Sequence, residues 1–178
     1  MKRLFGFAIL LGAAVTPIPA TLVERLTLEQ LTDRSERIVH GRCRRTWSAW
    51  DANHQAIWTH CEVEVIDPLK GGAVKSLTVS EPGGVVDGME MMIDGVPRWE
   101  AAQELVLFLY RTPVGYWRAR GLGQGKYHVT GSRVHGSLEG ISLVDSARPG
   151  AGRSTDLRRL EGMSLDRFKA TIRGALTR

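Results

Sequence analysis

The sequence predicts a single, mainly β domain, an antiparallel barrel with a short helix before it and an amphipathic helix after it. Between residues 37 and 130, runs rich in Val, Ile, Trp and Thr are broken at short intervals by Gly and Pro. This spacing is typical of many short strands and not of alternating strands and helices. A capping-box spacing precedes these runs, and a helical apolar pattern follows them. The length of 178 residues, 43% of them hydrophobic, suits one globular domain and excludes a wholly disordered chain.

The first 20 residues have the three-part layout of a secretory signal peptide. Lys2 and Arg3 form a charged start, an apolar run follows from Leu4 to Val15, and we expect cleavage after Ala20. The protein is therefore expected in the periplasm or the medium. The apolar run is about twelve residues long, against roughly 20 for a membrane-spanning helix, so a permanent anchor is the weaker alternative.

The formal net charge of +5 is unevenly placed along the chain. Without the predicted signal peptide, 22 basic and 19 acidic side chains leave a net charge of +3. Residues 148–178 carry eight basic and three acidic side chains, whereas residues 21–147 carry 14 and 16. The body of the protein is thus slightly acidic, and we expect no nucleic-acid partner because such a partner requires a basic face.

The first element after the signal peptide is a short helix. Thr27 and Gln30 have the spacing of a capping box, which predicts a helix of about two turns toward Arg34. The strands expected after it span residues 37–50, 56–66, 76–80, 89–93, 104–111, 116–122 and 126–130.

Two further segments follow a barrel domain of residues 21–144. Residues 145–163 are rich in Gly, Pro, Ser and Arg, which predicts a flexible linker. Residues 164–178 place Phe168 and Ile172 on one helical face, so we expect a C-terminal amphipathic helix that packs on the barrel.

The first two strands are expected to form a hairpin with its turn at Asp51 to His54. If the numbers of paired residues sum to 104, apolar residues share the inner face and opposite charges meet on the outer face. The expected inner pairs are Val39 with Val65, Gly41 with Val63, and Cys43 with Cys61. The expected outer pairs are His40 with Glu64, Arg42 with Glu62, and Arg44 with His60.

This register places the only two cysteines opposite each other. For an exported protein it predicts a Cys43–Cys61 disulfide, which stabilises the fold by about 3 kcal/mol in the chain-entropy model. Two buried free thiols are the alternative. A metal bound by both cysteines is less favoured, because no Cys-x-x-Cys spacing or nearby His cluster completes the site.

No pattern of catalytic or metal-binding residues stands out. The histidines lack the spacing that presents two metal ligands on one face, and they are interpreted as surface residues in charge pairs. No Gly-x-Ser-x-Gly elbow identifies a nucleophile. We therefore expect no enzymatic activity, no metal and no cofactor. The five histidines are His40, His54, His60, His128 and His135.

Tryptophans and methionines supply the candidate binding surface. Methionines form adaptable apolar surfaces, and Trp58 is expected to point outward with His60, although packing in the core is the alternative for both residue types. The glycines around Gly83 and Gly123 match no phosphate-binding loop and are interpreted as bends at barrel corners. The candidate surface residues are Trp50, Trp58, Met89, Met91, Met92 and Trp99.

Eight motifs follow one another at residues 33–42, 50–51, 57–59, 69–71, 82–84, 95–99, 106–109 and 124–129. In this order they resemble a group of uncharacterised exported bacterial proteins to which no activity is assigned. The layout is also similar to the OB-like barrel of netrin-like domains and tissue inhibitors of metalloproteinases. Those inhibitors chelate their target's zinc through an N-terminal Cys, but the expected mature chain starts at Thr21 and its first Cys is Cys43, so that mechanism does not carry over.

Three hypotheses for the function follow. The leading one is an exported, non-enzymatic interaction domain that contacts another protein, such as an exported protease, through residues 51–56 and 85–99. The second is a module that binds a carbohydrate or another cell-envelope ligand through outward Trp and Arg side chains. The third is a hydrolase with an unrecognised site. Fold alone does not choose among them.

Overall fold

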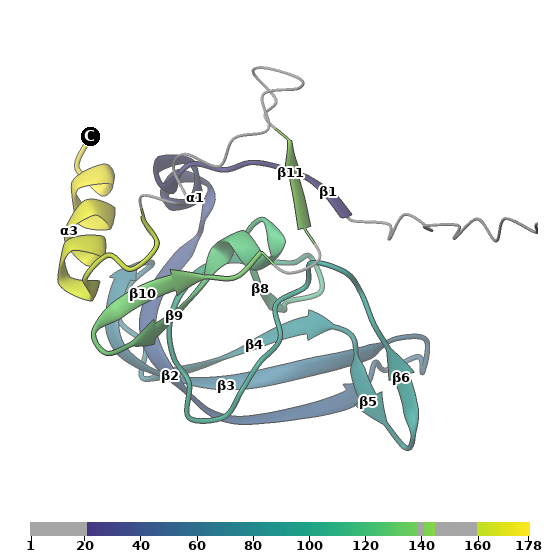
Figure 1. Ribbon diagram of the computed structural model, residues 1–178. Coiled ribbons are helices and arrows are strands. Elements are labelled where there is room, and N and C mark those ends of the chain that lie inside the picture. The colour runs from purple at the N-terminus through teal and green to yellow at the C-terminus, as the bar shows by residue number, and fades with distance from the viewer. Residues whose placement is uncertain (1–20, 139–140, 145–159) are drawn as a thin grey trace, which may run out of the picture.

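The computed structural model describes residues 21–138, 141–144 and 160–178. The predicted signal peptide and most of the predicted linker lie outside the described residues. The fold is mainly β, with two α-helices in the described part (Figure 1). The helical elements are α1 (Leu28–Arg34), the 3-10 helix η1 (Leu122–Gly125) and α3 (Leu165–Leu176). The strands are β1 (Thr21–Glu24), β2 (Arg37–Trp50), β3 (Ile57–Lys70), β4 (Ser76–Pro82), β5 (Gly84–Val86), β6 (Met89–Met91), β7 (Glu104–Arg111), β8 (Trp117–Ala119), β9 (Lys126–Thr130), β10 (Arg133–Gly136) and β11 (Ile141–Val144).

Five strands close into a barrel in the order β7, β2, β3, β4 and β8, because β8 pairs with both β4 and β7. Neighbouring strands are antiparallel except β4 and β8, which are parallel and meet at one residue pair, Val79 with Trp117. This β4–β8 contact is called the seam below. β9 and β10 extend the sheet beyond β7, and β5 and β6 form a separate ribbon. The closed five-stranded barrel confirms the predicted fold class.

Strand β7 separates two hydrophobic cores. Its side chains alternate between the faces of the sheet, so Leu105, Leu107 and Leu109 point into the barrel and Val106 and Phe108 point to the outside. All five are fully buried. A strand that is buried on both faces has apolar residues at consecutive positions, and residues 105–109 of β7 are all apolar.

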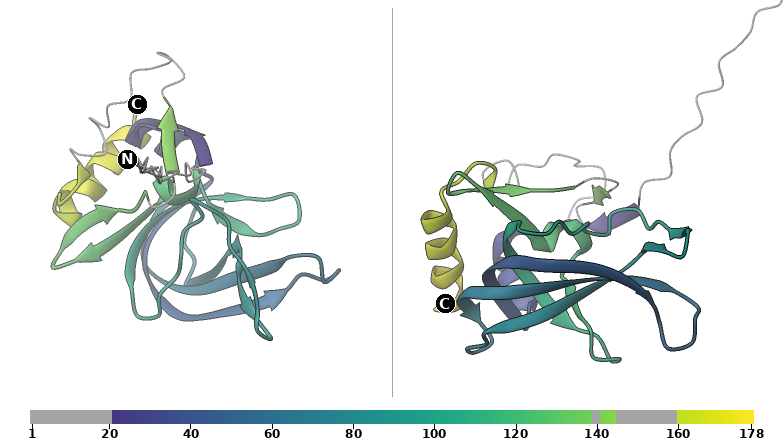
Figure 2. Two further views of the ribbon diagram at one scale, coloured as in Figure 1. Left: turned by 45° about the vertical axis from the view of Figure 1, so that its right-hand side comes forward. Right: turned by 90° about the horizontal axis from the view of Figure 1, so that it is seen from below.

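The C-terminal helix α3 covers the outer core, as predicted from its apolar face. Phe168 and Ile172 are fully buried, and the ring of Phe168 lies 6.2 Å from that of Phe108 and 4.8 Å from that of Tyr127. Burial of each such side chain contributes about 1.5–3 kcal/mol. The helix lies at the opposite end of the molecule from the β5–β6 ribbon (Figure 2).

Ion pairs also hold α3 on the barrel. The Asp67 carboxylate of β3 binds Lys169 at 2.5 Å and Arg173 at 2.7 Å. Burial favours a raised pKa for Asp67, but the hydrogen bonds and charges of the two cations outweigh this effect and lower it.

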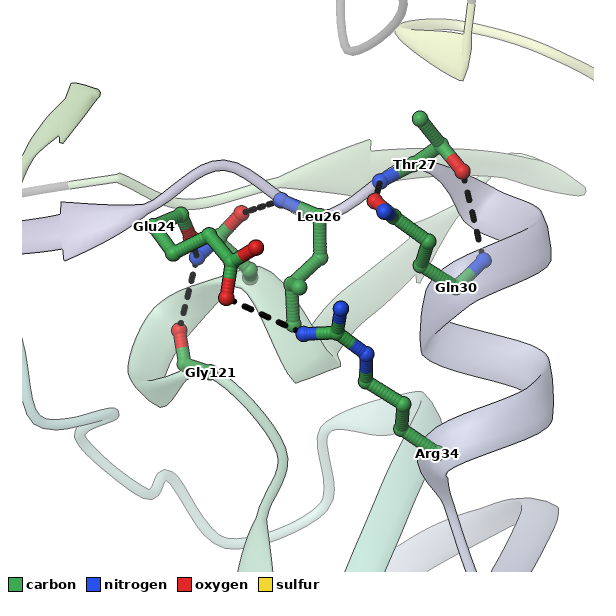
Figure 3. Close-up of polar contacts among 7 residues, drawn as sticks. Glu24, Leu26, Thr27, Gln30, Arg34 and Gly121 are labelled. Atoms are coloured by element: carbon green, nitrogen blue, oxygen red, sulfur yellow. Dashed lines mark hydrogen bonds and ion pairs between the residues drawn. The ribbon is translucent and has the colours of Figure 1, made fainter. Parts of the chain in front are cut away.

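The helix α1 begins as predicted. The Thr27 hydroxyl accepts a hydrogen bond from the Gln30 backbone N–H, and the Gln30 side chain accepts one from the Thr27 N–H, which completes the capping box (Figure 3). At the other end of the helix, Arg34 forms an ion pair with Glu24 at 3.0 Å. The buried side chain of Gln124 donates to the Glu24 carbonyl, which ties this segment to η1.

The β2–β3 hairpin turns where predicted, but its register differs from the predicted one. The loop runs from Asp51 to Ala56, so the first pair is Trp50 with Ile57, and paired residues sum to 107 in place of 104. A β-bulge at Arg44 lowers this sum to 106 for the pairs that Gly41, Arg42 and Cys43 form. Periodicity determines which side chains share a face, whereas loop length and bulges determine the register.

The cysteines are joined although they are not directly opposite each other. Cys43 faces Val63 and Cys61 faces Thr46, so the two cysteines are diagonal neighbours with Cα atoms 6.1 Å apart. The predicted Cys43–Cys61 disulfide is confirmed, and the register that suggested it is wrong.

The predicted charge pairs across this hairpin are wrong for the same reason. The interpretation of His40 as a surface residue is also wrong, because it is 5% exposed and lies beside Val106 of the outer core. The observed ion pairs are Arg44 with Glu64 at 2.9 Å, Arg45 with Glu62 at 2.6 Å, and His40 with Glu104 at 2.8 Å.

Candidate functional site

The β5–β6 ribbon is a hairpin that pairs with no other strand in the described residues. Val86 pairs with Met89 across a two-residue turn, Asp87-Gly88, in which both residues have positive φ angles. An Asp-Gly pair is favoured in this type of turn because the chain must enter the left-handed region twice. The hairpin projects beyond the barrel wall at the same end as the β2–β3 loop (Figure 1).

Glycines set the direction in which the hairpin leaves the barrel. Gly83 and Gly84 follow β4 with φ angles of 111° and 131°. A Cβ atom on Gly84 would lie 2.3 Å from the Thr59 hydroxyl oxygen and 2.5 Å from that of Ser48. Only glycine therefore allows β5 to pass this close to β2 and β3, which confirms the predicted bend at this corner.

Four large apolar side chains on and after the hairpin are exposed. Val85 is 56% exposed, Met89 54%, Met92 64% and Ile93 45%. We call these four residues the apolar hairpin surface. Val85 pairs with Glu90 and Met89 pairs with Val86, so Val85 and Met89 point to opposite faces of the ribbon, and both faces of the hairpin expose apolar side chains.

The charge on this segment has one sign. Between residues 82 and 97 the chain carries Asp87, Glu90 and Asp94 and no Lys, Arg or His. Directly after this segment, the Arg98 guanidinium lies 3.8 Å from the Met92 sulfur, so one basic group also contacts the apolar hairpin surface.

A cleft of about 250 Å³ lies between the hairpin and residues 96–99. Met91, Met92 and Trp99 line it. Trp99 is only 8% exposed and belongs to the core inside the barrel, with the Lys126 ammonium 5.2 Å from the centre of its ring. Of the predicted surface residues, the structure therefore brings the methionines together around the hairpin and places Trp99 beneath them as a core residue.

The structure places Trp50 and Trp58 elsewhere. Trp50 stands at the β2–β3 loop, where its ring stacks on His54 with a centroid distance of 5.9 Å. Trp58 is half-buried and packs on Tyr116 at 4.7 Å. Because adjacent side chains of a strand point to opposite faces, Trp58 lies on the other face of β3 from Thr59, which lines the cleft.

An aromatic row on the outer wall of the barrel was not predicted as a unit. The rings of Trp47 and His60 stack at 5.1 Å, and His60 meets Tyr116 at 6.1 Å. The Arg45 guanidinium lies 4.7 Å from the centre of the Trp47 ring, and burial lowers the pKa of His60. The strand register determines which rings are neighbours. The predicted register did not pair Trp47 with His60, so this row was not predicted.

A larger groove of about 850 Å³ is polar. Arg42, Glu104, Lys126 and His128 are among its lining residues. The Glu104 carboxylate is already bound by His40 at 2.8 Å and by Arg42 at 3.4 Å. Burial and, secondarily, the charge of a neighbouring histidine lower the pKa of His128.

A histidine–hydroxyl pair is the arrangement closest to catalytic chemistry in the described residues. His60 Nδ1 lies 2.8 Å from the Ser80 hydroxyl oxygen. Ser80 is only 2% exposed, and both residues line a groove of about 470 Å³ along β4. In the described residues His60 forms no hydrogen bond with a carboxylate that would orient it as a base. Within the described ranges, no three His, Cys, Asp or Glu side chains gather closely enough to hold a metal ion.

The seam contains a buried carboxyl group that was not anticipated. Glu81 is 1% exposed, and its two oxygens accept hydrogen bonds from the Ala119 N–H at 2.6 Å and from Arg118 at 3.0 Å. Burial raises the pKa of Glu81 to about 7, against the opposing effects of Arg118 and Ala119. The alternation Leu77, Val79, Glu81 could have predicted the inward position.

Comparisons with family models and with curated proteins find no match to this sequence. The helices of the described residues are all too short or too polar to cross a membrane. The disulfide is consistent with an oxidising extracellular environment.

Proposed function

We propose that this chain is an exported, non-enzymatic binding domain that attaches to another exported protein through the apolar hairpin surface. The observation that carries the proposal is the exposure of Val85, Met89, Met92 and Ile93 on a ribbon that has no strand partner in the barrel. Burying these side chains against a partner contributes about 25 cal/mol for each Å² of apolar area removed from water.

The shape and composition of this surface favour a protein partner. Sites for small molecules are concave, whereas this ribbon projects from the molecule (Figure 1). Methionine is enriched at the centre of protein interfaces, and the surrounding rim is polar. The acidic groups Asp87 and Glu90 lie on the hairpin, so the part of a partner that faces its tip is expected to be basic.

The outer aromatic row supports a carbohydrate ligand less well. A sugar stacks on an aromatic ring only where the face of that ring is open. Trp47 already has His60 and the Arg45 guanidinium as neighbours, and Trp58 has Tyr116 and the Arg118 guanidinium. The faces of these two rings are therefore partly covered by neighbouring side chains, which leaves less ring surface for a sugar.

Two observations support the non-enzymatic part of the proposal. His60, beside the Ser80 hydroxyl, forms no hydrogen bond with a carboxylate in the described residues, and the Glu104 carboxylate in the polar groove is bound by two basic side chains. Among exported proteins, a protease is the first partner class to test, because a narrow projecting ribbon suits entry into a substrate cleft.

A crosslinking experiment tests the proposal. A photoreactive amino acid at position 89 is compared with one at position 114, because Val114 is an apolar residue on a different turn that is 76% exposed. With the exported fraction of the source cells, we expect one protein crosslinked from position 89 and none from 114. The double substitution Met89→Ser and Met92→Ser, with the probe moved to position 85, is expected to abolish that product. Equal crosslinking from both positions, or recovery of glycan alone, rejects the proposal.

A further inference from the structure

Strand β4 has one edge that the barrel leaves partly open. It pairs with β3 over residues 76–82, but with β8 only at Val79. The hydrogen bond from the Val65 N–H to the Lys75 carbonyl identifies the hydrogen-bonded pairs of the β3–β4 ladder. Antiparallel ladders alternate, so the backbone N–H groups of Ser76 and Thr78 point away from β3, toward this open edge.

A basic groove runs along the same edge. It has a volume of about 470 Å³, and its lining includes Ser76, Thr78, Arg37, Arg111 and Trp117. No Asp or Glu is among the residues that line it in the described part of the chain. The groove follows β4 from Ser76 to Ser80, where His60 also lines it, whereas the β5–β6 hairpin begins after the end of this strand.

The two arginines are held in place without a carboxylate partner for their guanidinium groups in the described residues. The Arg37 guanidinium donates to the Gly72 carbonyl at 2.9 Å, and the Arg111 guanidinium donates to the Gly115 carbonyl at 3.4 Å. Both lie over the ring of Trp117, at 5.4 and 5.9 Å from its centre. The neighbouring Glu36 carboxylate accepts a hydrogen bond from the backbone N–H of Arg111. Two positive charges thus remain available beside the open edge.

We propose that this groove binds an extended acidic segment of a partner protein, which adds to β4 as a strand. The outward N–H groups of Ser76 and Thr78 supply main-chain hydrogen bonds, as in other cases of strand addition. In an extended peptide alternate side chains share a face, so carboxylates two residues apart reach Arg37 and Arg111 together. Intervening apolar side chains contact Trp117 and Leu77, which also lines the groove.

A peptide fits these features better than an acidic glycan does. A glycan uses the guanidinium groups equally well, but it has no backbone that continues a β-ladder. The open edge at Ser76 and Thr78 is therefore the feature that separates the two ligands. This proposal does not depend on the apolar hairpin surface, since the two surfaces share no residue.

The test uses the full chain and the capped peptide Glu-Val-Glu-Val-Glu as the probe. We expect binding that weakens with salt and slows hydrogen exchange at the Ser76 and Thr78 amides. The substitution Thr78→Pro removes one outward N–H, and we expect it to weaken binding about tenfold, whereas Thr78→Val keeps the N–H and leaves binding within about twofold.

Charge variants complete the test. The double substitution Arg37→Gln and Arg111→Gln is expected to weaken binding at least about tenfold, and Arg167→Gln on the exposed face of α3 serves as the matched control. Unchanged exchange at Ser76 and Thr78 rejects the proposal. So does equal binding by the Pro and Val variants, provided that circular dichroism shows both folded. Tighter binding of oligogalacturonate than of the peptide, or self-association that the peptide displaces, overturns the assigned occupant.

Discussion

The seam and the β5–β6 hairpin depart from the ordinary pattern of burial in opposite directions. At the seam the carboxyl group of Glu81 is buried, and at the hairpin Met89 and Met92 are exposed. Neither arrangement is explained by stability alone, since a buried charge loses hydration and an exposed apolar side chain gains no burial. The seam has an internal explanation, because Glu81 reinforces a closure that rests on one backbone pair. No contact within the described residues explains why Met89 and Met92 are exposed at the hairpin. A contact with another molecule would explain it.

Of the changes at the seam and the hairpin, removal of the seam carboxyl group is expected to have the largest effect. Glu81→Ala leaves the Ala119 N–H without its partner and Arg118 without its ion pair. We expect the free energy of unfolding to fall by about 3–5 kcal/mol in chemical denaturation. Glu90→Ala, which removes an exposed carboxylate on the hairpin, is the control and is expected to stay within about 0.5 kcal/mol. A loss below about 1 kcal/mol for Glu81→Ala would show that the seam closes without this side chain.

The disulfide is the next largest contribution. The double substitution Cys43→Ala and Cys61→Ala opens a loop of 18 residues, and we expect a loss of about 3 kcal/mol. Reduction of the wild-type disulfide, followed by the same denaturation experiment, should give a similar loss. If neither treatment lowers the midpoint, strand pairing alone holds β2 and β3 together.

The pH dependence of stability distinguishes a buried carboxyl group from an ordinary ion pair. Because burial raises the pKa of Glu81 to about 7, the folded state retains a proton that the unfolded state loses above about pH 4.5. The stabilisation is therefore fully present below the unfolded pKa and is lost as pH rises through 7. We expect the wild type to lose about 2 kcal/mol relative to Glu81→Gln between pH 5 and 7.5.

The comparison with Glu81→Gln isolates this group from others that titrate nearby. Burial lowers the pKa values of His60 and His128, which makes stability fall as pH decreases, and these residues are present in both proteins. Asp67, whose pKa is also lowered, loses its stabilising effect only at lower pH. Parallel pH profiles for the two proteins would mean that Glu81 is ionised throughout this range.

The sequence predicted the classes of element because local patterns determine them. The Thr27–Gln30 capping box, the apolar face of α3 and the short runs of Val and Ile each gave the right element. The hairpin register was wrong because the length of the loop after Trp50 and the bulge at Arg44 depend on geometry that periodicity does not carry. The disulfide was still predicted, because diagonal neighbours in a sheet also bring two cysteines within bonding reach.

The candidate site was predictable only in part. The methionines stand out in the sequence, and the Asp-Gly pair between Val86 and Met89 is a sequence signal for the hairpin that presents them. The basic groove could not be predicted, because Arg37 and Arg111 are far apart in the chain and meet only when the barrel closes. Burial of Trp99 depends in the same way on the core of the closed barrel, and spacing along the chain does not reveal it.

The hairpin should be nearly independent of the stability of the barrel, and this is the smallest expected effect. We expect Met89→Ser with Met92→Ser to change the free energy of unfolding by less than about 0.5 kcal/mol, because both side chains are more than half exposed. Phe168→Ala in the outer core provides the contrast, with an expected loss of about 3–5 kcal/mol. Denaturation of the three proteins under one condition measures both values. A loss above about 2 kcal/mol in the methionine variant would mean that the hairpin packs as part of the fold, and the case for a partner at this surface would lose its main support.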